Sequence, residues 1–333
     1  MQGAWPKWLA SAVIVALAML CSVSGRAADD GLELEAKIPL GEVRGRIDHF
    51  ALDAGRQRLF VAELGNDTVG VIDLKSRKLL RTIAGLGEPQ GIGYVPSTDK
   101  LYVANAGDGS VRLFQGADYT PGGRIELGDD ADNIRVDDQS NRVFVGYGKG
   151  GIAVIDPASR AKVADIALKA HPEGFQIDPG SGRLYANIPD ARHIAVVDVN
   201  ASRQIGSWTF PGARSNFPMV FDEATKQVVA VFRRPARLVS FAPDGAVAAF
   251  LEICDDSDDV FIDAKRHRLY VSCGAGFVDV VDHSGTGFAR LGRIPTISGA
   301  RTSFFHPEMD RLFVAVRATA REPAAIWIYR PTP

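Results

Sequence analysis

Short runs of apolar residues, separated by polar turns, recur along almost the whole chain. The run RLFV at 58–61 is the first clear copy, and similar runs follow at intervals of about 40 residues. They are KLYV at 100–103, RVFV at 142–145, RLYA at 183–186, QVVA at 227–230, RLYV at 268–271 and RLFV at 311–314. Successive copies start 42, 42, 41, 44, 41 and 43 residues apart. Seven copies at so steady a spacing indicate a structural repeat.

Each repeat contains the same series of short segments. In the first copy, an apolar run, HFALD at 49–53, is followed by a polar turn and by RLFV. A turn rich in Gly, Asn and Asp leads to a third run that ends in Asp, VGVID at 69–73, and the unit closes with KLLRTIAG at 78–85. Short β-branched runs bounded by turn residues predict β-strands. Four strands in each 40–45 residues are typical of a propeller blade.

The pattern therefore predicts an all-β fold, a single seven-bladed β-propeller with four antiparallel strands per blade. The seventh copy starts near Ala300 and has room for only three strands, whereas LELEAKIPL at 32–40 looks like a fourth strand without a blade. We expect this N-terminal strand to close the last blade, which leaves the ring without an open end. The predicted blades span about 41–86, 87–129, 130–170, 171–212, 213–254, 255–299, and 300–333 together with 32–40.

The N-terminal 27 residues do not follow the repeat. Lys7 precedes the apolar run WLASAVIVALAMLCSV at 8–23, and small residues follow it. This order predicts a signal peptide, residues 1–27, with cleavage after Ala27 or, alternatively, after Ala28. An uncleaved membrane anchor is the other interpretation, but the run is short for a span of about 20 residues. We expect residues 28–333 to form a periplasmic or secreted domain, with no membrane span after signal removal.

The net charge of the chain limits the class of partner that we expect it to bind. The chain has 38 Lys and Arg against 40 Asp and Glu, and removal of Lys7 and Arg26 with the signal peptide leaves 36 against 40, a formal charge of −4. Nucleic acid is an unlikely partner for such a surface, because binding it depends largely on neutralising phosphates. We expect a monomer that binds a small molecule or a protein partner.

The segment Leu101–Asn105, LYVAN, resembles the YVTN-type repeat of bacterial and archaeal YncE-like β-propellers. The resemblance extends over about residues 32–333, and it implies a propeller fold. Similar repeats occur in the haem d1 propellers of nitrite reductases. These families share a scaffold but have diverse functions. The chain contains no C-x-x-C-H motif for covalent haem attachment.

Candidate ligand-binding residues are found where each repeat enters its first strand. These entry segments and the turns after each RLYV-like run share one face of a propeller, here called the top face. The candidates are Arg46, Asp48, His49, Asp132, Asn133, His171, Glu173, Arg214, Asn216, Asp258, Asp259 and Arg301. Carboxylates outnumber cations in these segments, which favours binding of cations or polar small molecules. The alternative is that the aspartates only cap turns.

Two groups in these segments have a second interpretation. Asp48 and His49 resemble an acid–base pair, but neighbours on a strand point to opposite sides. If the strand has begun at Asp48, the two side chains cannot both face the channel. The basic segment FRRPAR at 232–237 also falls on the top face. This segment either binds a carboxylate or phosphate group, or is a solvated loop.

Two cysteines remain after signal removal, Cys254 and Cys273. The repeat alignment places both at the top ends of strands in neighbouring blades, and export permits disulfides. We expect a disulfide between them. Two unlinked buried thiols are the alternative.

Three functions fit these observations. The first is a binding or scaffold protein that acts through the mouth of its channel on a small polar ligand, a metal ion or a partner protein. The second is a metal-dependent enzyme of lyase, hydrolase or lactonase type, with a divalent metal ion held by mouth carboxylates and by His49 or His171. The third, suggested by the haem d1 propellers, is an accessory protein of a periplasmic redox system. The residues identify no cofactor beyond the possible divalent metal.

Overall fold

The computed structural model describes residues 1–3 and 31–333 of the chain. The predicted signal peptide and its cleavage site fall almost wholly on residues 4–30 and lie outside the described part. Within the described part, no helix has the length and apolar character needed to cross a membrane.

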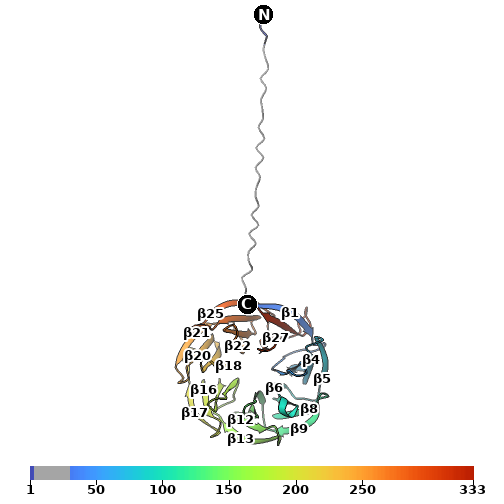
Figure 1. The fold of residues 1–333 in the computed structure, drawn as a ribbon, viewed down its shortest axis with the longest axis vertical. Helices are drawn as coiled ribbons and strands as arrows, with labels where there is room; N and C mark the ends of the chain where they lie inside the picture. The colour runs from blue at the N-terminus through green and yellow to red at the C-terminus, as the bar shows by residue number, and fades with distance from the viewer. Residues whose placement is uncertain (4–30) are drawn as a thin grey trace.

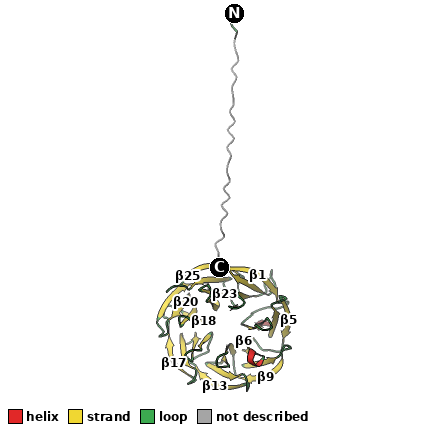
Figure 2. Cartoon of the chain, in the orientation of Figure 1, coloured by secondary structure: helices red, strands yellow, loops and turns green. Residues whose placement is uncertain are grey.

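The described fold is all-β, as the repeat pattern predicted. Antiparallel sheets surround a central axis in the arrangement of a β-propeller (Figure 1). Strands and loops account for almost the whole ring (Figure 2). The helices of the described residues are two single 3₁₀ turns, η1 (Leu64–Asn66) and η2 (Pro96–Thr98).

Most sheets consist of four strands that are consecutive in the chain. They are β2 (Phe50–Asp53), β3 (Arg58–Glu63), β4 (Thr68–Asp73) and β5 (Lys78–Ile83); β6 (Pro89–Val95), β7 (Lys100–Asn105), β8 (Ser110–Gln115) and β9 (Thr120–Glu126); β18 (Arg214–Asp222), β19 (Gln227–Arg234), β20 (Ala236–Phe241) and β21 (Val247–Glu252); and β22 (Ser257–Asp263), β23 (Arg268–Cys273), β24 (Phe277–Asp282) and β25 (Ala289–Pro295).

One sheet has eight strands, in the order β10-β11-β12-β13-β17-β16-β15-β14. They are β10 (Ala131–Asp137), β11 (Arg142–Tyr147), β12 (Gly151–Asp156), β13 (Ala161–Ala167), β14 (Phe175–Asp178), β15 (Arg183–Ile188), β16 (His193–Asp198) and β17 (Arg203–Trp208). Its two halves are each an antiparallel series of four strands. A single parallel pair, Ala167 with Arg203, joins them.

The remaining sheet contains both ends of the ring. β1 (Leu32–Pro39) lies outermost, beside β28 (Ala325–Pro331), which is followed by β27 (Arg311–Val316) and β26 (Ser303–His306). The pairing of β1 with β28 is antiparallel, from Leu32 opposite Pro331 to Pro39 opposite Ala325. The strand predicted at 32–40 thus completes the C-terminal sheet.

The hydrophobic core lies between neighbouring sheets. In the RLFV run of β3, Leu59, Phe60 and Val61 are all fully buried, so successive side chains are covered on both faces of the sheet. Leu59 and Val61 pack with the sheet of β26–β28, whereas Phe60 packs with the sheet of β6–β9. This position between two neighbours explains why the second strand of each repeat is continuously apolar rather than alternating.

The strands that begin each series of four, β2, β6, β10, β14, β18, β22 and β26, are called the inner strands. Several have an irregular register close to the top face, as between Ser257 and Asp259 in β22, where Asp258 is the additional residue. Similar shifts occur in β6, β10 and β18. Bulges of this kind redirect side chains, and here they fall among the candidate site residues.

Candidate functional site

All seven inner strands contribute to one central cavity of about 470 Å³. A volume of this size suits a small ligand. Its wall contains the majority of the candidate residues from the entry segments. Those that line it are Arg46, Asp48, His49, Asp132, Asn133, Glu173, Asp258 and Asp259.

Asp48 and His49 both line this cavity, and they contact each other. The strand β2 begins at Phe50, so the alternation that would separate the two side chains does not yet apply. His49 Nδ1 lies 2.8 Å from Asp48 Oδ1, and Arg46 Nη2 donates to Asp48 Oδ2 over 2.8 Å. The pair thus has the geometry of an acid and base in contact, with a guanidinium on its far side.

Burial and the contact between Asp48 and His49 shift the pKa values of these two side chains in opposite directions. Burial would raise the pKa of Asp48, but the hydrogen bond and charge of His49, together with Arg46, lower it to about 2. Burial would lower the pKa of His49, yet the contact with Asp48 and the charges of Asp259 and Asp132 raise it to about 9. At neutral pH the pair is therefore a carboxylate and an imidazolium.

Asp258 is held between two arginines. Arg233, from β19, forms an ion pair with Asp258 Oδ1 and donates from Nε to the Ser257 carbonyl over 2.7 Å. Arg301 Nε lies 2.8 Å from Asp258 Oδ2, and Arg301 Nη1 donates to Asp256 Oδ1 over 2.8 Å. The segment FRRPAR is thus not simply a solvated loop, because Arg233 reaches a cavity-lining carboxylate.

His171 lies beside the cavity and contacts Asp132. Its Nε2 is 3.6 Å from Asp132 Oδ2, and its Nδ1 donates to the Gly148 carbonyl over 2.6 Å. Although burial lowers the pKa of His171, the contacts with Asp132 and Gly148 raise it to about 9. A charged imidazole therefore faces Asp132.

Two carboxyl groups of the wall bind protons unusually tightly. Burial, reinforced by the charge of Asp132, raises the pKa of Glu173 to about 8. Burial also raises the pKa of Asp259 to about 7, against the charge of His49 and a 2.8 Å hydrogen bond from the Ser303 backbone N–H. A protonated carboxyl group can donate a hydrogen bond to a ligand.

Arg135, from β10, lines the cavity but forms no ion pair with any carboxylate of the described residues. Its Nη1 donates to the Ile134 carbonyl over 2.8 Å and to Asn133 Oδ1 over 3.3 Å. Burial lowers the pKa of Arg135, while the charges of Asp259 and Asp132 oppose the shift. No described residue takes a hydrogen bond from its Nε or Nη2, so these donors are available to a ligand in the cavity.

The other candidates lie outside the cavity wall. Asn216 is buried and donates to Asn187 Oδ1 over 2.7 Å, which gives it a structural role between β18 and β15. Arg301 does not line the cavity itself but forms an ion pair with Asp258, which does. Arg214 is exposed and lines a separate surface groove together with Arg192 and Arg234.

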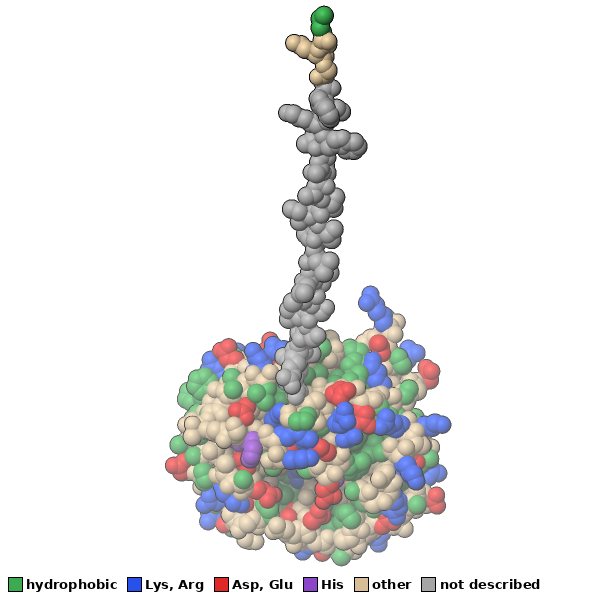
Figure 3. Space-filling view, turned by 45° about the horizontal axis from the view of Figure 1, so that its top comes forward, with side chains coloured by type: hydrophobic (Ala, Val, Ile, Leu, Met, Phe, Trp, Pro, Cys, Tyr) green, Lys and Arg blue, Asp and Glu red, His purple; other side chains and the backbone are tan. Residues whose placement is uncertain are grey.

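The carboxylates of the cavity wall have partners or raised pKa values that bear on the predicted binding of cations or polar small molecules. The carboxylates Asp48, Asp132 and Asp258 are each in contact with arginine or histidine, and Glu173 and Asp259 have raised pKa values. Within residues 1–3 and 31–333, no group of three or more His, Cys, Asp or Glu side chains is arranged to hold a metal ion. The face of the molecule drawn in Figure 3 shows cationic and anionic side chains intermixed.

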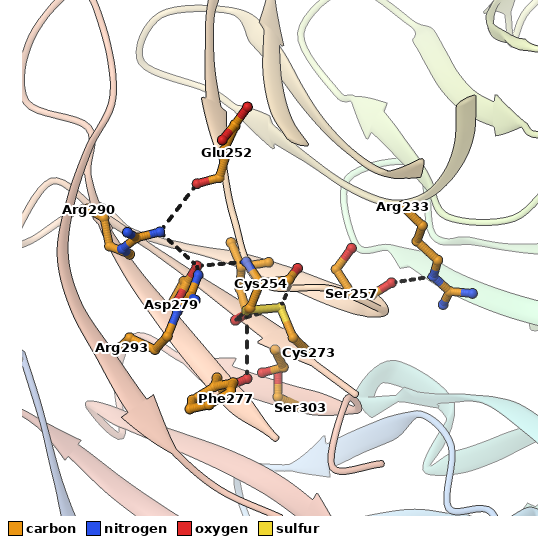
Figure 4. Close-up of a disulfide and its surroundings, with 12 residues drawn as sticks. Arg233, Glu252, Cys254, Ser257, Cys273, Phe277, Asp279, Arg290, Arg293 and Ser303 are labelled. Atoms are coloured by element: carbon orange, nitrogen blue, oxygen red, sulfur yellow. Dashed lines mark hydrogen bonds and ion pairs between the residues drawn. A yellow bond between two sulfur atoms is a disulfide. The ribbon is translucent and has the colours of Figure 1, made fainter. Parts of the chain in front are cut away.

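The predicted disulfide is present and lies close to this mouth. Cys254 and Cys273 are linked, with their Cα atoms 5.9 Å apart, and both are buried. Figure 4 shows the bridge beside the buried Asp279, which accepts the Cys254 backbone N–H over 2.9 Å. Arg293 donates twice to the Asp279 carboxylate, over 2.6 and 2.8 Å. The segment that enters β22 is thereby anchored to the neighbouring strands.

Sequence reasoning missed Arg135, although the repeat contains a signal for it. When the inner strands are aligned on their last residues, Arg135 lies two positions before the end of β10. The equivalent residues are Ala51, Gly93, Gln176, Val220, Phe261 and Phe304. Arg135 is the one charged side chain in this series. Such an exception in a repeat points to the ligand rather than to the scaffold.

Neither a protein-family model nor a curated protein matches the chain. Solved structures do match in fold. A chain of Kuenenia stuttgartiensis hydrazine synthase aligns with a TM-score of 0.75 and 18% identity, covering 85% of this chain and 95% of that one. A chain of the mitotic checkpoint complex also aligns with a TM-score of 0.75, at 12% identity, covering 97% of this chain and 98% of that one. Identities this low establish the propeller fold alone.

Proposed function

We propose that this protein is an exported, YVTN-type β-propeller of seven blades that binds a small organic anion, bearing a carboxylate, in its central cavity. The blade count treats the eight-stranded sheet as two blades, because one residue pair alone joins its halves. The division then follows the seven predicted repeats. Export rests on the N-terminal pattern of residues 1–27 and is consistent with the disulfide.

Arg135 carries the proposal. It is a guanidinium inside a cavity, and no described carboxylate neutralises it, although several carboxylates lie nearby. Each of those acids already has a cationic partner or a raised pKa. Arg135 is partly buried over the Phe175 ring, without a carboxylate partner. A carboxylate bound in the cavity would supply that partner through two parallel hydrogen bonds to Nε and Nη2.

The metal-dependent alternative meets a specific obstacle. A cation at Asp258 would have to displace Arg233 and Arg301, and a cation at Asp48 would have to displace Arg46 and His49. Binding of an anion needs no such rearrangement. We therefore place the binding function ahead of a metal-dependent enzyme.

A thermal-unfolding panel tests this function. We expect mono- and dicarboxylates to raise the Tm of the wild-type protein, and Mg²⁺, Ca²⁺, Zn²⁺ and ammonium salts to leave it unchanged, because a ligand of the native state stabilises by mass action. The variant Arg135→Gln should lose the response, whereas Arg135→Lys should retain part of it. Stabilisation by divalent ions without a response to carboxylates would contradict the proposal and favour the metal-dependent function.

A further inference from the structure

The cavity has two chemically distinct levels. The mouth level contains the ionisable residues described above, namely Asp48, His49, Asp132, Glu173, Asp258 and Asp259. The deeper level is formed by the residue two positions before the end of each inner strand. These residues are Ala51, Gly93, Arg135, Gln176, Val220, Phe261 and Phe304, and all of them line the cavity. The deeper level is uneven in both size and polarity.

Aromatic rings form one side of this level. Phe261 and Phe304, from the adjacent strands β22 and β26, meet edge to face with their centroids 6.0 Å apart. Phe50, from β2, lies beside Phe304 with a centroid separation of 6.4 Å. Phe261 and Phe304 are only partly buried by protein, and both border the cavity. An apolar surface is thus open to a ligand.

The smallest residues of the level lie between these rings and Arg135. Around the ring, β26 adjoins β2, as the Phe50–Phe304 contact shows, and β2 and β6 are followed by β10. The residues of β2 and β6 at this level are Ala51 and Gly93. The level is thus narrow-walled by small residues along this arc, and the side chains of Ile134 and Val136 from β10 pack against Gly93.

We propose that the cavity selects a carboxylate that carries an aromatic or similarly bulky apolar group. The carboxylate pairs with Arg135, and the apolar group packs against Phe261 and Phe304 in the same cavity. Glu173 at the mouth, with its raised pKa, adds a hydrogen-bond donor. This assignment rests on the proposed function and adds the requirement for an apolar group, which the anion site alone does not impose.

Calorimetric titration with three probes separates the two requirements. Phenylacetate carries both groups, acetate lacks the ring, and phenylacetamide lacks the charge. We expect wild-type protein to bind phenylacetate at least about tenfold more tightly than acetate, because burial of a ring is worth that much or more. It should also bind phenylacetate at least about tenfold more tightly than phenylacetamide, because the charge-assisted pair with the guanidinium is lost.

Variants assign each requirement to its residue. Arg135→Gln should weaken phenylacetate to the level of phenylacetamide and leave phenylacetamide unchanged. Phe261→Ala should weaken phenylacetate and leave acetate unchanged. The matched control is Arg183→Gln, an exposed arginine at the start of β15 that does not line the cavity. Circular dichroism and thermal unfolding confirm that each variant is folded before titration.

The outcomes are distinguishable. If acetate binds as tightly as phenylacetate, the requirement for an apolar group is overturned and the anion-binding function stands. If Phe261→Ala and the parallel variant Phe304→Ala both leave phenylacetate binding unchanged, the placement of the ring is overturned. If no probe binds, if phenylacetamide binds as tightly as phenylacetate, or if Arg135→Gln has no effect, both the inference and the proposed function fail.

Discussion

At the scale of single residues, Glu173 makes the stability of the folded protein depend on pH. Its carboxyl group lies in the wall beside Asp132, and its pKa is raised to about 8 from an ordinary value of 4.5. Around pH 5–8 the folded protein thus retains a proton that the unfolded chain has lost. Stability must therefore fall as the pH rises through this window. His49, with a pKa raised from 6.5 to about 9, acts in the same direction between those values.

Replacement of Glu173 isolates its share of this pH dependence. We expect Glu173→Gln to be more stable than the wild type at pH 8.5, by about 1–3 kcal/mol, because the amide never ionises. At pH 5 the difference should largely disappear, while the share of His49 is retained in both proteins. Urea unfolding at the two pH values measures the change. The control Glu223→Gln alters an exposed residue outside the cavity, and equal pH dependence in wild type and Glu173→Gln would refute the expectation.

At the scale of elements, β1 ties the N-terminal end of the ring to its C-terminal strands. Ile38 is fully buried between β1 and its neighbours, whereas Leu34 on the same strand is 42% exposed. Ile38→Ala should lower the free energy of unfolding by about 2–5 kcal/mol, and Leu34→Ala should change it by about 0.5 kcal/mol or less. Denaturant unfolding measures both. Equal losses would show that β1 is not a packed part of the sheet.

The disulfide is a second link between elements of the fold. Cys254 and Cys273 close a loop with a sequence separation of 19. By the loop-entropy estimate, the double variant Cys254→Ala/Cys273→Ala should lose about 3 kcal/mol of stability. Reductant supplies the control, since it should lower the denaturation midpoint of the wild type and leave that of the double variant unchanged. A wild type insensitive to reductant would indicate that the bridge does not form in solution.

The elements themselves could be predicted well from the sequence, for a physical reason. A second strand such as RLFV packs between two sheets, so its apolar pattern survives in every repeat, and the spacing of the copies reveals the series of strands. The bulges near the top face leave no comparable pattern. Because a bulge depends on the partner strand, the sequence could not show that Arg233 reaches Asp258. It also could not show that β2 begins only at Phe50, which lets Asp48 and His49 share one cavity.

At the scale of the whole molecule, the site belongs to the ring rather than to any one repeat. Seven unlike inner strands contribute to a single cavity. The charges of Asp132, Asp258 and Asp259 depend on residues from other strands, His171, Arg233 and His49. A tally of charges along the chain therefore predicted a cation-attracting mouth, while the assembled ring pairs those acids and leaves Arg135 without a carboxylate. The signal in the sequence that pointed to Arg135 was its exception in the aligned repeat, an arginine among small, apolar and amide residues.

The pairing of β1 with β28 also determines an order of events during biosynthesis. Leu32 is translated long before its register partner Pro331. Until the final strands have been synthesised, the sheets can form only an open arc with unpaired strand edges at its two ends. Closure of the arc into a ring is thus a separate step that must follow the synthesis of β28. It joins segments far apart in the sequence, which is a contact of high order and therefore slow to form. The central cavity acquires its complete wall only when this step is finished.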